Sequence, residues 1–184
     1  MKKTILTLAC LVVFGTLSSA QDAAIKTNLA KDATLSFDAG VEAALSEQWT
    51  LDISGSYNPW TLENNRKWKH WMVQPELRYW GCQKFNGWFV GLHAQGGQYN
   101  MGRIPVFKLK DTRAEGWFAG AGVGLGYQWI LSRHLNLEAE LGAGYNYTRY
   151  DRYRCAECGK KLTEDHPYDY WGVTKAVLGL VYVF

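Results

Sequence analysis

Two cysteines with the spacing of metal ligands lie near the C-terminal end of the chain. Two residues separate Cys155 from Cys158, Gly159 follows, and His166 comes eight residues after the second cysteine. A tight turn of this kind lets two thiolates bind one metal ion, as in zinc knuckles. Because a closed zinc site needs four ligands and the chain has one such pair, we favour a disulfide or two free thiols over a structural zinc ion.

A second group of side chains that could do chemistry consists of acids and bases on the polar face of alternating segments. Where every second residue is apolar, these charges occupy the opposite positions, among small and polar neighbours. Buried charges have to be paired, so we expect these residues to form one network inside the protein. They are Lys26, Glu42, Asp52, Glu76, Arg78, His93, Glu138, Glu140 and Lys175.

Basic residues gather in two further stretches, close to Trp60, Trp68 and Trp71. Such residues bind phosphate groups, for example those of lipopolysaccharide, and the alternative is a solvated surface charge. They are Arg66, Lys67 and Lys69, followed by Arg103, Lys108, Lys110 and Arg113.

A catalytic group is not evident in the sequence. An enzyme acting on lipid needs a nucleophile with a base in reach. His93 and His134 are predicted at the interior and at a short turn, and no serine is an obvious partner for His70. We therefore expect no catalytic residues.

The elements that must position these residues are β-strands. Apolar and polar residues alternate with a period of two from about residue 23 onward, as in Trp49, Leu51 and Ile53 against Thr50 and Asp52. Eight such runs are predicted, at residues 23–31, 35–46, 48–58, 69–81, 87–99, 115–131, 134–149 and 170–184.

Loop lengths and aromatic residues indicate how the strands are arranged. Short turns alternate with long charged connections at residues 59–68, 100–114 and 150–169. Aromatic residues lie near the short turns (Trp49, Tyr79, Trp88, Tyr127, Trp129, Tyr182, Phe184) and near the long loops (Tyr57, Trp71, Tyr99, Trp117, Tyr145, Tyr147). Two aromatic belts are typical of membrane barrels. The pattern predicts an all-β, eight-stranded, antiparallel up-and-down transmembrane β-barrel.

The C-terminal residues predict the orientation of this barrel. The chain ends at Phe184, with Tyr182 on the same face, which is typical of the signal that barrel-insertion machinery reads. We expect an outer-membrane protein with periplasmic termini and extracellular long loops. The interior of eight strands barely holds its own side chains, so the charged network should block it, and a narrow pore is the alternative.

The first 20 residues are predicted to be a cleaved signal peptide. Lys2 and Lys3 precede a short apolar run, and Ala20 ends it, which places the barrel domain at residues 21–184. Loss of the two lysines reduces the basic residues from 20 to 18, against 17 acidic residues. A net charge of +1 excludes the polycationic surface on which nucleic acid binding depends.

Seven segments carry a resemblance to a known family: AIKTNL (24–29), YNPW (57–60), KWKHW (67–71), QPELRYW (74–80), EGWF (115–118), GYQWI (126–130) and YRCAECG (153–159). They resemble a Bacteroidota domain-of-unknown-function family of small outer-membrane β-barrels. The resemblance implies export, an OmpA- or OmpX-like barrel and frequent association with fimbrial genes. It supplies no catalytic residues.

Together these features favour a structural or interaction role. The outer loops would contact lipopolysaccharide, fimbrial components or other surface proteins, while the barrel contacts membrane lipids and the insertion machinery. The alternatives are an enzyme that modifies lipids of the outer leaflet and a narrow pore.

Overall fold

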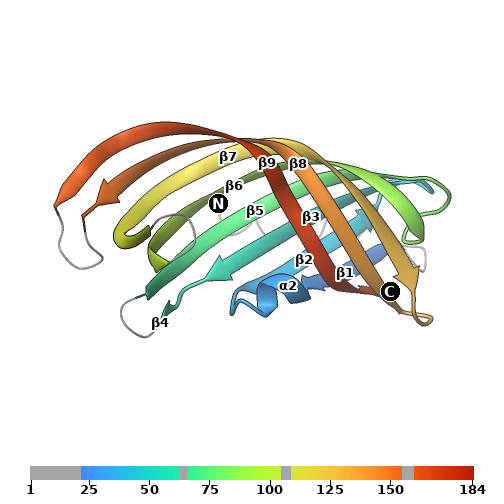
Figure 1. Cartoon of the computed structure of the whole chain (residues 1–184). Coiled ribbons are helices and arrows are strands. Elements are labelled where there is room, and N and C mark those ends of the chain that lie inside the picture. Colours follow the sequence, from blue (N-terminus) through green and yellow to red (C-terminus); the bar gives the residue numbers. More distant parts are fainter. Residues whose placement is uncertain (1–21, 63–65, 105–108, 155–159) are drawn as a thin grey trace, which may run out of the picture.

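The computed structural model (Figure 1) describes residues 22–62, 66–104, 109–154 and 160–184, and eight strands make up most of this part of the chain. They are β1 (Ala23–Asn28), β2 (Phe37–Ala44), β3 (Trp49–Asn58), β5 (Arg66–Trp80), β6 (Gly87–Ile104), β7 (Leu109–Ile130), β8 (Leu135–Tyr153) and β9 (Lys161–Val183). A two-residue strand, β4 (Thr61–Leu62), and one helical turn, α2 (Leu29–Asp32), complete the elements. In these ranges no helix has the length and apolarity needed to cross a membrane. The predicted signal peptide, residues 1–20, lies outside them.

All of the strands belong to one antiparallel sheet, in which consecutive strands are neighbours. β1 pairs with β9 as well as with β2, and β3 pairs with β5, so each of the eight strands has a partner on both edges. The sheet is therefore a closed, eight-stranded ring, whose tilted strands are visible in Figure 1. The prediction of an all-β fold with eight antiparallel, up-and-down strands is confirmed.

The alternation of side chains gives the ring an apolar outside and a polar inside. On β3 the apolar Leu51 and Ile53 are exposed, whereas Thr50 and Asp52 are buried. Four successive inner positions of β7 are glycines (Gly120, Gly122, Gly124 and Gly126), and space requires at least one of them: a Cβ at Gly126 would lie 2.2 Å from the ring of Phe89. The glycines thus leave room for large side chains from other strands to cross the interior.

The strands on one side of the ring are longer than the sequence predicted. Residues 100–114 and 150–169 were expected to be loops, but β6 and β7 extend to Ile104 and from Leu109, and β8 and β9 extend to Tyr153 and from Lys161. The many charged residues of these segments favoured loops. In the structure, ion pairs between neighbouring strands accommodate the charged side chains on the sheet, as between Lys161 and Asp151 at 2.9 Å. The prediction of long loops at these two places is wrong.

The connection between β1 and β2 also differs from the prediction. Residues 29–31, expected to continue the first strand, form α2 instead. The side chain of Asn28 accepts a hydrogen bond from the backbone N–H of Ala30 (3.1 Å) and so caps the helical turn. Within the expected loop 59–68, the short strand β4 pairs Thr61 with Lys67 of β5.

A β-bulge changes the direction of side chains in β9. Gly142 of β8 pairs with Lys175, whereas the next residue pairs with Val173, which leaves Thr174 as the extra residue. As a result Thr174 and Lys175 both reach the interior, where they contact His93 and Glu76.

Most aromatic residues of the two expected belts lie on the outside of the ring. Trp49, Trp88 and Phe184 are exposed at the short-turn end, and Tyr57 and Trp117 are exposed at the other end.

Tyr99 is the exception. It was predicted to face outward, but its ring lies 6.3 Å from that of Phe118 and lines the interior. Tyr99 shares its parity on β6 with His93 and Gln95, and this alternation decides its direction.

Candidate functional site

The interior of the ring is organised around Arg78 on β5. The strand alternates so that Gln74, Glu76, Arg78 and Trp80 are all buried. The guanidinium of Arg78 donates to the carboxylates of Glu76 (2.6 Å), Glu42 (3.1 Å), Glu138 (2.8 and 2.9 Å) and Glu140 (2.8 Å). All five of its N–H groups are directed at acceptors in this geometry, which a planar guanidinium fits better than an ammonium.

Two lysines complete the arrangement. Lys26 lies on β1 and Lys175 on β9, the two strands whose pairing closes the ring. Lys26 contacts Glu42, Asp52 (3.3 Å) and Glu138 (3.5 Å). Lys175 contacts Glu76 (2.6 Å) and Glu140 (3.1 Å). The structure thus brings together all nine residues of the predicted network, here called the interior ion cluster: Lys26, Glu42, Asp52, Glu76, Arg78, His93, Glu138, Glu140 and Lys175. It joins seven of the eight strands across the ring.

Below the interior ion cluster, at the short-turn end, the ring is filled by apolar side chains. Trp80 is completely buried, its ring centre lies 4.7 Å from that of Phe89, and its indole N–H donates to Thr50 (2.9 Å). Arg78 lies over the same Phe89 ring, 4.3 Å from its centre. Trp80 and Phe89 form what we call the apolar plug, which was not predicted, although Trp80 has the same parity on β5 as Glu76 and Arg78.

At the other end, the interior opens into a cavity of about 850 Å³. We call it the vestibule. Thr174, which contacts His93 of the interior ion cluster (2.9 Å), and Asn146, which accepts a hydrogen bond from Gln95 (2.7 Å), lie in its lining. The walls are mainly apolar: Trp68, Met72, Tyr99, Met101, Phe118, Tyr168 and Tyr170. Several of these residues belong to the strand extensions, so the vestibule could not be predicted while those segments were expected to be loops.

The vestibule also holds a serine beside a histidine. The Oγ of Ser56 lies 3.3 Å from Nε2 of His70, across the β3–β5 pair. The expectation that no serine is a partner for His70 is therefore wrong. This pair could have been predicted from the alternation of side chains. When β3 and β5 pair in antiparallel fashion, Ser56 and His70 both face the interior at the same end of the ring.

The basic residues expected in loops lie mainly on strands. Arg113 binds Glu115 at 2.6 Å and lies over the ring of Tyr153. Lys67 pairs with β4, whereas Lys69 lines a separate groove of about 580 Å³. Arg66, Arg103 and Lys110 belong to β5, β6 and β7, and Lys108 lies outside the described residues.

The expected metal or disulfide site is only partly described. Cys155 and Cys158 lie outside the described residues. His166 is exposed on β9, where its ring lies 5.7 Å from that of Tyr150. Cys82 is an exposed free thiol in the turn between β5 and β6, at the other end of the ring.

A family model for proteins of unknown function (DUF3575) matches residues 5–184. The chain belongs to the DUF3575 family. The expected relationship to a family of unknown function is thus confirmed, and the match includes every strand of the ring. Neither the curated proteins nor the solved structures gave a significant match.

The β8–β9 extension of this DUF3575 chain should respond to acid through Asp151. The backbone N–H of Asp165 donates to its carboxylate (2.8 Å), and this bond, followed by the contact with Lys161, holds the pKa of Asp151 below its usual value. A lowered folded pKa means that the carboxylate stabilises the hairpin above the unfolded value of about 3.9 and loses this effect as the pH falls through the folded pKa. We expect the NMR signal of the Asp165 amide to shift only in that acidic range.

Asp151→Asn is the control for this titration. It should remove the acid-dependent shift of the Asp165 amide, because an amide side chain does not titrate. An unchanged titration in Asp151→Asn would assign the effect to another group.

Proposed function

We propose that this chain is a transmembrane β-barrel of a bacterial outer membrane with a structural or interaction role. The observation that carries the proposal is the distribution of polarity across the ring wall. Leu92, Val123 and Leu141, in the middle of the outer surface, are 61%, 58% and 63% exposed, whereas charged residues fill the inside. We call this apolar outer surface the apolar sleeve. Such a surface is stable in contact with lipid, whereas in water it promotes aggregation.

The orientation follows from the two ends of the ring. Short turns face the periplasm in outer-membrane barrels, so the strand extensions would project from the cell. Tyr182 and Phe184, whose rings are 5.4 Å apart on the outside of the ring, would form the signal for the insertion machinery. The Bacteroidota origin and the OmpA-like character implied by the resemblance belong to the same proposal.

The strand extensions are the part of the molecule available for partners. β7 and β9 have 22 and 23 residues, about twice the 9–11 residues that a tilted strand needs to cross a bilayer. The surplus would stand above the membrane as paired hairpins that contact lipopolysaccharide, fimbrial components or other surface proteins.

Membrane insertion is tested by fractionation and electrophoresis. We expect the protein in the outer-membrane fraction, with a band that changes mobility on boiling, because folded barrels resist detergent until they are heated. A heat-insensitive protein in the soluble fraction would contradict the proposal.

The interaction role is tested by crosslinking in the native membrane. A photo-reactive residue in place of Leu162, exposed on the β9 extension, should capture lipopolysaccharide or a surface protein. The matched control is Val41, which is exposed in the middle of the sleeve and should capture membrane lipid alone. Identical products from both positions would argue against a role for the extensions.

The pore alternative has little support, because the interior ion cluster spans the ring between the apolar plug and the vestibule. A lipid-modifying enzyme is favoured by one observation, the Ser56–His70 pair in an apolar cavity. However, Nδ1 of His70 has no hydrogen-bond partner among the described residues, whereas serine hydrolases orient their histidine with a third group. Lipid A mass profiles from cells that carry wild type or Ser56→Ala decide between the two roles, since a difference would establish the enzyme.

A further inference from the structure

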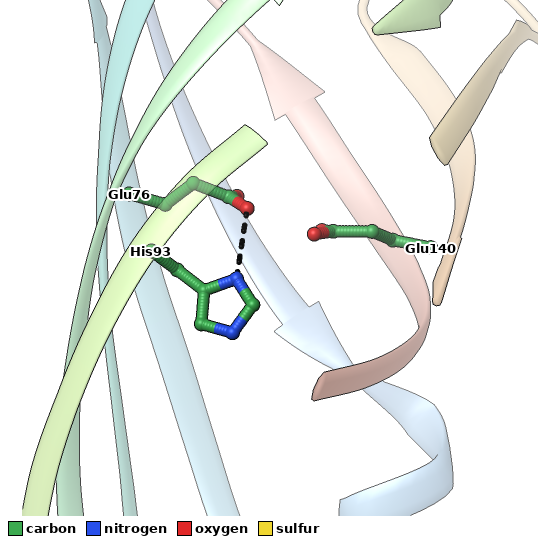
Figure 2. A group of neighbouring side chains, drawn as sticks. All are labelled: Glu76, His93 and Glu140. Atoms are coloured by element: carbon green, nitrogen blue, oxygen red, sulfur yellow. Dashed lines mark ion pairs between the residues drawn. The ribbon is translucent and has the colours of Figure 1, made fainter. Parts of the chain in front are cut away.

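Four side chains of the interior ion cluster each leave one polar atom without a hydrogen-bond partner among the described residues; that of Asp52, Oδ1, lies 3.3 Å from Nζ of Lys26, and the other three lie together. These three atoms are Oε1 of Glu76, Nδ1 of His93 and Oε1 of Glu140, and the three residues are at least 95% buried. Figure 2 shows the three side chains, from β5, β6 and β8, directed toward a common point. Their ligand atoms lie within 4.8 Å of one another.

The remaining polar atoms of these residues are engaged, which fixes the direction of the free ones. Oε2 of Glu76 binds Arg78 and Lys175, each at 2.6 Å, and Oε2 of Glu140 binds the same two bases at 2.8 and 3.1 Å. Both carboxylates therefore turn Oε1 away from the bases.

His93 is oriented in the same way. Its Nε2 lies 2.9 Å from Oγ1 of Thr174, the extra residue of the β9 bulge. When Nε2–H donates to this hydroxyl oxygen, the lone pair of Nδ1 faces Oε1 of Glu76 at 3.8 Å, too far for a hydrogen bond. In this tautomer two hydrogen-bond acceptors, Nδ1 of His93 and Oε1 of Glu76, face each other, and a cation between them would stabilise the arrangement.

Glycines keep the space around these atoms open. Gly91 of β6 and Gly124 of β7 are partners in the sheet. A Cβ at Gly91 would lie 2.1 Å from Oε1 of Glu76, and one at Gly124 would lie 2.4 Å from Oε1 of Glu140. Both free carboxylate oxygens thus occupy volume that exists because two paired positions lack a side chain.

The charges of the interior ion cluster do not balance. Five carboxyl groups face three bases, so the fully ionised cluster with neutral His93 has two excess negative charges. Uncompensated buried charge is costly. One divalent cation would neutralise the excess, and so would two protons, which makes these the competing explanations.

We propose that Glu76, His93 and Glu140 bind one divalent transition-metal ion of the Zn²⁺ or Mn²⁺ type. Carboxylate oxygen with imidazole nitrogen suits these ions. Ligand atoms about 2.1 Å from a tetrahedral ion lie roughly 3.4 Å apart, close to the observed separation of Nδ1 and Oε1. The ion would join β5, β6 and β8, and Thr174 is a positioning residue for His93. This inference concerns the interior alone and holds whether or not the extensions bind a partner.

Zinc binding to the folded, detergent-solubilised full chain tests the proposal. The measurements use the Cys155→Ser, Cys158→Ser background, which removes the two thiolates as a competing site. After removal of metal with a chelator, we expect one Zn²⁺ per chain in a titration and a higher thermal unfolding midpoint with Zn²⁺ than without it. His93→Gln should abolish both effects, whereas His70→Gln, an imidazole of the vestibule, should leave them unchanged.

A second variant separates a bound ion from a merely structural effect. Thr174→Val keeps every ligand atom and should weaken Zn²⁺ binding by about 10- to 100-fold, because it removes the group that orients His93. Co²⁺ in place of Zn²⁺ should give ligand-field absorption bands in the same cysteine-free background with the interior unsubstituted, a readout that does not need any interior variant to fold. If the protein binds no Zn²⁺, or if His93→Gln retains the full stoichiometry, the cluster is balanced by protons and the proposal is wrong.

Discussion

Replacing Arg78 with methionine is expected to lower the free energy of unfolding by about 3–5 kcal/mol. Arg78 is completely buried and contacts four glutamates, so its removal leaves uncompensated carboxylates in the interior rather than a simple cavity. Urea titration of the folded protein in detergent, followed by tryptophan fluorescence, measures the change.

Arg113→Met is the matched control for Arg78→Met. Arg113 also binds a carboxylate at 2.6 Å, but its partner Glu115 is about half exposed. Exposed ion pairs contribute about 0–1 kcal/mol, so the urea midpoint should change little. Equal losses in the two variants would mean that burial of Arg78 does not set the stability of the ring.

Replacing Trp80 with alanine is expected to cost about 3–5 kcal/mol, the usual range for a large buried aromatic side chain. The indole fills the short-turn end of the interior, packs against Phe85 and Phe89, and donates a hydrogen bond to Thr50. The same urea titration measures the loss, and the remaining tryptophans still report on folding.

Trp88→Ala provides the comparison for Trp80→Ala. Trp88 lies at the same end of the ring but is 61% exposed on the outside. Because its removal opens no interior cavity, we expect less than half of the effect of Trp80→Ala. A larger loss for Trp88→Ala would show that the outer belt, and not the apolar plug, determines stability at this end.

Much of the fold could be predicted because one physical rule dominates the sequence. In a strand that separates two environments, successive side chains face opposite sides, so parity alone placed Glu76, Arg78 and Glu138 in a shared interior. The same rule predicts that Trp80 and Tyr99 face the interior. Trp80 was nevertheless left out of the predicted interior, and Tyr99 was placed in an outer aromatic belt because of its residue type and its position near a long connection.

Other features could not be read from local alternation. The strand extensions are charged like loops, and the partner strand is what makes Asp151 and Lys161 ladder residues. The bulge at Thr174 depends on the register between β8 and β9. The Ser56–His70 pair likewise depends on the pairing of β3 with β5. The register of two strands, which decides which residues lie opposite each other, cannot be derived from the alternation within each strand.

The origin of the bases in the interior ion cluster has a consequence for assembly. Strands β2 to β8 supply all five carboxylates and only Arg78, whereas Lys26 comes from β1 and Lys175 from β9, the two strands that pair at the seam. In the closed ring Lys26 lies 3.5 Å from Glu138 of β8 and Lys175 lies 2.6 Å from Glu76 of β5, so closing the seam brings each lysine to a carboxylate of a strand with which its own strand does not pair. Ring closure therefore forms these ion pairs in the same step that removes the interior from water, so the pairing of β1 with β9 joins buried charges as well as backbone hydrogen bonds.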